Sequence, residues 1–333
     1  MRVSILRGFA FLSGPVSIHR RGTDVSILLA LIIFLLMFMV FISMILLVIG
    51  PVMLLHPHRR TEDYYRRHGH PLHPQAVGLP CEELTLKTSE GIRLACWLIR
   101  THEQGRGTIV YLHGVSESRI VGIPMAKLLH DHGYNVFLYD SRRHGDSGGQ
   151  YCTYGFYEKH DVSTVMDYLE GRTDLVSGRF GLFGSSMGAA VALQVAAIDD
   201  RVAAVVAESG FATLRSIFDD YQRRMIKLPW HYLRNLVIKR SEHLAHFRAN
   251  AVSPLDAVRN IRVPVFILHG TADTLIRSRY SEMVFAHAGE PKELWLIPGA
   301  QHNNMAEVGG EEYCRRITGF FARSLTPHSS QAR

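Results

Sequence analysis

Two hydrophobic patterns divide the chain near residue 80. Residues Val25–Leu55 are almost all apolar and include no charged side chain. From about Cys81 onward, short apolar runs alternate with longer segments of helical periodicity. We expect strands at 83–88, 92–100, 108–112, 134–139, 179–183, 202–207, 263–268 and 293–297, and helices at 125–132, 156–169, 187–198, 278–287 and 311–323. This alternation predicts an α/β fold, with a mostly parallel central sheet and helices on both faces.

The long apolar run predicts one transmembrane helix. A helical span needs about 20 apolar residues, whereas the apolar core of a cleaved signal peptide has about 7–15. No A-x-A-like cleavage site follows the run. Pro51 after Gly50 is expected to end or kink the helix, so the span proper would be 25–49. We therefore expect a single-pass membrane protein.

Basic residues give little help with the orientation of this span. Four arginines precede it and four follow it: Arg2, Arg7, Arg20 and Arg21 before, and Arg59, Arg60, Arg66 and Arg67 after. The positive-inside rule compares these counts, and here they balance. The short basic tail before the run favours an inside N-terminus, which would place the catalytic domain on the extracytoplasmic side.

The rest of the chain divides by composition. We expect an N-terminal tail at 1–24, the anchor at 25–55, a linker rich in His and Pro at 56–80, an α/β domain at 81–325 and a C-terminal tail at 326–333. One segment, 213–260, is longer than a crossover helix requires. It carries Lys, Arg and several aromatic residues. We interpret it as a small helical cap that governs substrate choice; an ordinary crossover helix with a long loop is the alternative. The mixed apolar and basic stretch at 225–240 would touch the membrane, or else its apolar face would pack on the domain core and its basic face would be solvated.

Composition narrows the class of protein further. The chain has 333 residues, a net charge of +7, 47% hydrophobic and 20% charged residues, which is typical of a folded domain. A basic balance suits nucleic acid, a membrane surface or simple solubility. No zinc-finger spacing, RNP-like motif or sustained basic run is present, which argues against nucleic acid. The four cysteines form no C-x-x-C pair, so we expect no metal site from them.

The pattern G-x-S-x-G, which can mark a nucleophilic serine, occurs twice. Around Ser186 it follows an apolar strand pattern and precedes an Ala-rich helical segment, the context of a nucleophile elbow. Around Ser147 it lies in a glycine-rich stretch that no helix follows, so we interpret that match as a loop. Ser185 stands one residue too early for the elbow. Ser186 is the predicted nucleophile.

A serine hydroxyl needs a base to take its proton, and in this order of elements the acid and the histidine follow the serine. Asp273 comes just after the apolar segment 263–268, and His302 follows the last expected strand. Loops at the carboxyl ends of parallel strands meet at one sheet edge, which favours Asp273 and His302 as the acid and the base. A turn or cap for Asp273 and a surface histidine for His302 are the alternatives. His269 ends a buried strand and is interpreted as structural.

The oxyanion of an acyl-transfer intermediate requires two hydrogen-bond donors. We expect the first to be the backbone N–H of Met187, directly after the nucleophile. The second is expected from the loop after 108–112, where Gly114 permits close approach and Val115 offers the N–H. Gly114 after His113 also suits a simple turn, and the two interpretations are compatible.

Five motifs in order resemble the α/β-hydrolase superfamily: YLHG at 111–114, YDSRRHGDSGG at 139–149, GLFGSSMGAA at 181–190, HGTADT at 269–274 and PGAQHNN at 298–304. The chain looks like the membrane-tethered branch related to acyl-protein thioesterases and prolyl-oligopeptidase-like esterases. That resemblance implies hydrolysis of an ester, thioester or amide through an acyl-enzyme, without cofactor or metal. The expected partners are a small or lipid-like ester substrate and the membrane, with no nucleic acid and no obligate protein partner.

Three other functions stay open from the sequence. A serine peptidase would be supported by an acidic clamp for a peptide amino end, and we identify none. An acyltransferase would use the same acyl-enzyme with an alcohol in place of water. A non-enzymatic binding module would be favoured by a missing triad member, but a Ser, an Asp and a His are all present in the expected order.

Overall fold

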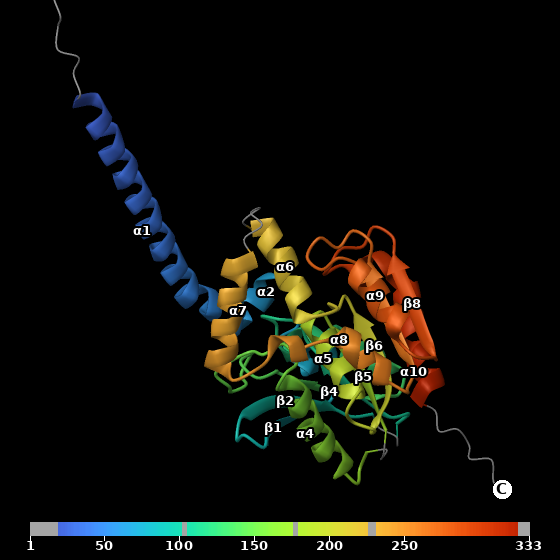
Figure 1. The fold of residues 1–333 in the computed structure, drawn as a ribbon. Coiled ribbons are helices and arrows are strands. Elements are labelled where there is room, and N and C mark those ends of the chain that lie inside the picture. The colour runs from blue at the N-terminus through green and yellow to red at the C-terminus, as the bar shows by residue number, and fades with distance from the viewer. Residues whose placement is uncertain (1–18, 102–104, 176–178, 226–230, 326–333) are drawn as a thin grey trace, which may run out of the picture.

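An eight-stranded sheet forms the centre of the computed structural model, which describes residues 19–101, 105–175, 179–225 and 231–325 (Figure 1). The strand order is β1-β2-β4-β3-β5-β6-β7-β8. β1 and β2 pair antiparallel, β2 pairs antiparallel with β4, and all later pairs are parallel. The bounds are β1 Glu82–Lys87, β2 Arg93–Ile99, β3 Thr108–Leu112, β4 Asn135–Tyr139, β5 Phe180–Ser185, β6 Val202–Glu208, β7 Val265–Gly270 and β8 Lys292–Ile297. The predicted α/β class and mostly parallel sheet are confirmed.

Helices cover both faces of the sheet because alternate side chains of each strand point to opposite sides. In β4, Phe137 and Tyr139 join one buried cluster, whereas Val136 and Leu138 join the other. Residues of α4, α5 and α9 line the first cluster, and residues of α3 and α10 line the second. The helices are α1 His19–Leu55, α2 Glu62–Arg67, α3 Ile123–Asp131, α4 Glu158–Glu170, α5 Met187–Ala196, α6 Leu214–Met225, α7 His231–Ala245, α8 Pro254–Ala257, α9 Arg279–His287 and α10 Met305–Leu325.

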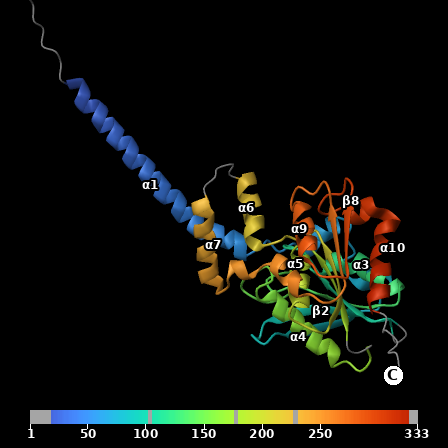
Figure 2. The same cartoon turned by 45° about the vertical axis from the view of Figure 1, so that its right-hand side comes forward.

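The apolar helix α1 runs away from the domain and joins it at its C-terminal end (Figures 1 and 2). It continues through Pro51 to Leu55, so the expectation that the helix ends at Gly50 and Pro51 is wrong. Leu55 is only 1% exposed and belongs to the core cluster of the hydrolase domain. The carbonyl oxygen of Leu55 accepts a hydrogen bond from Cys152 N (2.9 Å). These tertiary contacts hold the last turn of the helix in place beyond the proline.

The segment after α1, predicted to be a linker at 56–80, packs against the domain. Arg59 donates from Nε to the carbonyl of Arg143 (3.1 Å) and from Nη1 to that of Gly145 (3.0 Å). Tyr65, in α2, is 1% exposed and lies in the second core cluster. The chain between α1 and β1, which we expected to be a linker, is therefore packed against the domain.

Between β6 and β7 the chain forms several helices instead of one crossover helix. α6 and α7 are the longest, and α8 with the 3₁₀ turns η3 Ala249–Ala251 and η4 Val258–Asn260 leads back to the sheet. α7 lies beside the C-terminal part of α1 in both views (Figures 1 and 2). A Cβ added to Gly50 of α1 would lie 2.8 Å from the methyl groups of Val237 in α7. Residues 226–230 of the stretch at 225–240 that we expected to touch the membrane, Trp230 among them, lie outside the described residues.

Candidate active site

Ser186 occupies a sharp turn between β5 and α5. Its backbone has φ 56° and ψ −114°, a conformation that is rare for residues other than glycine and is typical of a nucleophile elbow. The turn is possible because its neighbours are small. A Cβ added to Gly184 would overlap the carbonyl of Gly188, and one added to Gly188 would overlap the carbonyl of Leu112. The two glycines of the motif are therefore required by packing.

The three side chains predicted from the sequence come together at the carboxyl ends of the strands. His302 Nε2 lies 3.0 Å from Ser186 Oγ, and His302 Nδ1 lies 2.7 Å from Asp273 Oδ2. If Nδ1–H donates to the carboxylate, Nε2 is free to accept the serine hydroxyl proton. The Asp273 side chain is fully buried, and that of His302 is 13% exposed. This geometry is that of a nucleophile, a base and an orienting acid.

Asp273 is held as an anion by its surroundings. Its Oδ1 accepts the backbone N–H groups of Leu275 (2.8 Å) and Ile276 (2.9 Å). Burial raises the pKa of Asp273, but hydrogen bonds from His269 and His302 outweigh it and hold the pKa below its usual range. The carboxylate therefore stays charged at neutral pH and can stabilise a positively charged imidazole on His302.

His269 has a part in this site that the sequence did not indicate. Its Nε2 lies 3.1 Å from Asp273 Oδ2 and 2.9 Å from Ile276 O, and its Nδ1 lies 2.7 Å from Ser281 Oγ. A neutral imidazole fits these three contacts when Nε2–H donates to Asp273 and Ile276 and Nδ1 accepts a hydrogen bond from the Ser281 hydroxyl. His269 was interpreted as structural, and the group that it contacts is Asp273, the candidate acid.

The two amides predicted to hold the oxyanion lie beside the nucleophile. Among the described residues neither Val115 N nor Met187 N has a hydrogen-bond acceptor. The amide of Gly114, in contrast, donates to Glu117 Oε2 at 2.9 Å. A Cβ added to Gly114 would lie 3.3 Å from Ser186 Cβ, so this loop closely approaches the serine.

The competing serines have other partners. Ser147 is 2% exposed; its hydroxyl donates to Asp140 O (2.6 Å) and accepts from Ala95 N (2.9 Å). Ser185 Oγ donates to Glu208 Oε1 (3.1 Å). Neither hydroxyl contacts a histidine among the described residues, so each has a structural explanation.

Glu208, at the end of β6, is a second buried acid that sequence reasoning missed. Its carbonyl accepts Ser186 N (2.8 Å), and its carboxyl accepts Tyr313 Oη (2.6 Å) and Ser185 Oγ. Burial raises the pKa of Glu208, against the effect of the hydrogen bonds from Tyr313 and Ser185. Only the three-dimensional pairing of β5 with β6 brings this residue under the elbow, so no local motif could indicate it.

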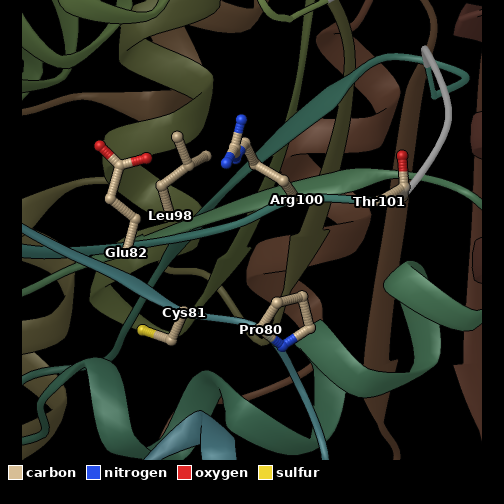
Figure 3. Close-up of a pocket in the computed structure, with 6 residues that line it drawn as sticks. All are labelled: Pro80, Cys81, Glu82, Leu98, Arg100 and Thr101. Carbon is tan, nitrogen blue, oxygen red and sulfur yellow. The ribbon is translucent and has the colours of Figure 1, made fainter.

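A separate cavity of about 390 Å³ lies at the other end of the sheet (Figure 3). Figure 3 shows its lining residues around the start of β1, at Pro80, Cys81 and Glu82, and around the end of β2, at Leu98, Arg100 and Thr101. The end of β2 lies beside the start of the antiparallel strand β4, since Ile99 pairs with Val136. In contrast, Ser186, Asp273 and His302 follow the carboxyl ends of β5, β7 and β8. This cavity is therefore remote from the candidate site. The described part of the chain contains no cluster of His, Cys, Asp or Glu suited to a metal ion.

Comparison with known proteins agrees with this arrangement. Residues 107–237 match the family model of the alpha/beta hydrolase fold. The uncharacterized protein YfhR of Salmonella typhimurium is 30% identical over 229 residues, which is 66% of this chain and 74% of that protein. The α/β-hydrolase domain-containing protein WAV2 of Arabidopsis thaliana is 28% identical over 260 residues, 76% of this chain and 82% of that protein.

Comparison with solved structures also indicates a hydrolase. The esterase Pf2001 of Pyrococcus furiosus superposes with a TM-score of 0.66 and 26% sequence identity, covering 81% of this chain and 99% of the esterase. The likeness extends over nearly the whole of that enzyme, so it concerns the complete catalytic domain. The chain therefore belongs to the α/β-hydrolase family, and its general chemistry is hydrolysis.

Proposed function

We propose that the chain is a serine hydrolase that cleaves ester or thioester bonds through an acyl-enzyme on Ser186. The observation that carries the proposal is the continuous contact from Ser186 Oγ through His302 to the buried Asp273, at 3.0 and 2.7 Å. The likeness to the Pyrococcus furiosus esterase supports an ester as the bond that is cleaved.

The proposed reaction has two halves. Ser186 Oγ attacks the carbonyl carbon while its proton passes to His302 Nε2, and the resulting oxyanion accepts hydrogen bonds from the amides of Val115 and Met187. Collapse breaks the bond to the alcohol or thiol, which leaves with the proton from His302. A water molecule then attacks the acyl-enzyme, His302 accepts the water proton, and Ser186 recovers it as the acid departs.

We further propose that the enzyme is a single-pass membrane protein that acts on lipid-like or acylated substrates. Within the described chain, α1 has one stretch, Val25–Leu55, long and apolar enough to cross a bilayer, and its apolar side chains are largely exposed. Burial of Leu55 in the core supports a retained anchor, because a removed signal sequence would take this core residue with it. The basic tail favours an extracytoplasmic catalytic domain.

The proposal is tested on the full-length chain in detergent micelles. Reaction with a fluorescent fluorophosphonate measures whether a serine is activated. Hydrolysis of p-nitrophenyl esters with acyl chains of increasing length then measures the preference of the site, and matched thioesters and aminoacyl amides separate the esterase from a peptidase. We expect labelling and faster hydrolysis of the longer esters. A chain that does not react with the probe and cleaves none of these compounds would contradict the proposal.

A further inference from the structure

We propose that Glu117, held by Arg60 from the segment after α1, positions the second oxyanion donor. The inference rests on the proposed function, since it concerns the amide of Val115. It makes the chain next to the membrane helix a positioning element of the active site. Its evidence is a series of contacts that runs from α1 to the nucleophile.

The first contact in the series closes the turn at residues 114–117, which we name the oxyanion turn. Glu117 N donates to Gly114 O at 3.3 Å, and Gly114 N donates to Glu117 Oε2 at 2.9 Å. Glu117 therefore closes the turn with both its backbone and its side chain. Between them Ser116 has φ 65°, an unfavourable conformation for a residue with a Cβ. The carboxylate stabilises a backbone shape that the turn does not prefer on its own.

The hydrogen bond from Gly114 N to Glu117 Oε2 also determines which backbone amide of the turn remains available to the oxyanion. Gly114 N cannot serve the oxyanion, because Glu117 already accepts its hydrogen. Val115 N comes next along the chain and has no acceptor among the described residues. Since the Cβ position of Gly114 lies 3.3 Å from Ser186 Cβ, a small rotation of the turn would change the distance from Val115 N to the reacting carbonyl. Oxyanion donors lose their effect when they are misplaced by about 1 Å.

The second contact in the series orients the carboxylate. Arg60 Nη1 lies 3.3 Å from Glu117 Oε1, the oxygen that Gly114 does not use. Both side chains are partly exposed, at 29% for Arg60 and 21% for Glu117. Such pairs contribute little to overall stability, so the effect that we expect from this pair is on geometry.

The third part of the series fixes Arg60 itself. Its neighbour Arg59 donates to the carbonyls of Arg143 and Gly145, and the carbonyl of Leu54 in α1 accepts Tyr154 Oη at 2.8 Å. The Arg60 guanidinium lies 4.8 Å from the centre of the Tyr64 ring in α2. The membrane-proximal segment is therefore bound to the domain before Arg60, at Leu54 and Arg59, and after it by the buried side chain of Tyr65. A displacement of α1 would reach the oxyanion turn through Arg60 and Glu117.

The test uses four variants of the full-length chain in detergent micelles. Glu117→Ala removes both side-chain contacts, Glu117→Gln keeps an oxygen that can accept Gly114 N, and Arg60→Ala releases the carboxylate. The matched control is Arg66→Ala, since Arg66 pairs with the exposed Asp63 in α2 and does not contact the oxyanion turn. For each we measure kcat and KM for p-nitrophenyl butyrate, the inhibition constant of an alkyl trifluoromethyl ketone, and the melting temperature.

The ketone is informative because Ser186 Oγ adds to its carbonyl carbon and creates the oxyanion that the two amides must hold. We expect Glu117→Ala to lower kcat and the affinity for the ketone by about 10- to 100-fold each, with KM changed by less than about threefold. Arg60→Ala and Glu117→Gln should give smaller losses of the same kind, and Arg66→Ala should match the wild type.

Two results would overturn the inference. If Glu117→Ala keeps kcat and ketone affinity within about twofold of the wild type, the turn does not depend on the carboxylate. If all activities fall only in proportion to the folded fraction, the pair is merely structural, and the milder Arg60→Ala variant decides this where Glu117→Ala folds poorly. A wild-type chain that neither reacts with a fluorophosphonate nor hydrolyses the ester would instead refute the proposed function.

Discussion

His269 and Asp273 lie four residues apart in the chain and are in direct contact, with Nε2 3.1 Å from Oδ2. The same Oδ2 atom lies 2.7 Å from His302 Nδ1, so one carboxylate oxygen is shared by two imidazoles. His269 therefore holds the same oxygen of Asp273 that contacts His302. Groups that orient the ligands of metal sites affect activity by about 10- to 100-fold, and we expect an effect of similar order from His269.

Replacement of His269 should therefore impair catalysis without removing the triad. We expect His269→Leu to lower kcat about tenfold, because Asp273 loses one of its hydrogen-bond donors and orients His302 less firmly. Steady-state hydrolysis of p-nitrophenyl butyrate measures this effect. His287→Leu is the control, since His287 is exposed and, among the described residues, its imidazole forms a hydrogen bond only to Met283 O of its own helix. An unchanged kcat in His269→Leu would show that Asp273 does not depend on His269.

The second G-x-S-x-G serine should matter for stability alone. Ser147→Ala removes the acceptor of the buried Ala95 N and the donor to Asp140 O. An unsatisfied buried amide costs about 1–3 kcal/mol, so the free energy of unfolding should fall by that amount. Urea unfolding measures the loss, and fluorophosphonate labelling of the remaining folded protein should be unchanged. Loss of labelling with unchanged stability would give Ser147 the role that we assign to Ser186.

Two buried histidines should make the folded state sensitive to acid. Burial lowers the pKa of His113 to about 4 and that of His144 to about 3, from an ordinary value of 6.5. The unfolded chain therefore binds more protons than the folded one below about pH 6.5, and stability is present above that pH and is lost as the pH falls towards 4. Each imidazole contributes on the order of 3 kcal/mol over this window.

Urea unfolding at pH 7 and pH 5 measures this dependence. His144→Phe removes one of the two groups, so the difference in unfolding free energy between the two pH values should shrink by the share of His144, about 2 kcal/mol. The comparison between variants cancels the contribution of other titrating groups, including Asp140, whose pKa is raised by burial and acts with the opposite sign. An identical pH dependence in the two proteins would contradict the neutral, buried state of His144.

Contact between α1 and α7 gives a prediction about packing. Gly50→Ile should push its new side chain into Val237, since even a Cβ at Gly50 would lie 2.8 Å from the Val237 methyl groups. Overpacking of this kind costs about 1–3 kcal/mol. Val237→Ala in the same chain should recover part of the loss, and the melting temperatures of the single and double variants measure the coupling. If the two substitutions changed the melting temperature additively, Gly50 and Val237 would not be in contact.

Much of the fold and site could be predicted because each feature has a local signal. The strand positions follow from short apolar runs, and Gly184 and Gly188 follow from the steric demands of the elbow. Asp273 and His302 were found because parallel strands bring their carboxyl ends to one edge of the sheet. The class of fold and the meeting of the three triad side chains agree with those predictions.

The features that were missed depend on contacts between distant segments. Glu117 closes a turn with Gly114, yet its pairing with Arg60 spans 57 residues. The continuation of α1 through Pro51 depends on Leu55 entering the core, and the packing of the expected linker depends on Tyr65 and Arg59. The sequence periodicity does not predict such contacts, because each depends on an apolar site or an unpaired carbonyl that exists only in the folded domain.

The identity of the nucleophile is tested most directly by mapping a covalent adduct. The full-length chain is treated with a fluorophosphonate, digested and analysed by mass spectrometry, alongside His302→Ala as a variant that lacks the base. We predict one adduct, on the peptide that contains Ser186, and a loss of labelling in His302→Ala. An adduct on Ser147, or labelling of Ser186 at the same rate without His302, would contradict the assignment of Ser186, His302 and Asp273 as the catalytic triad.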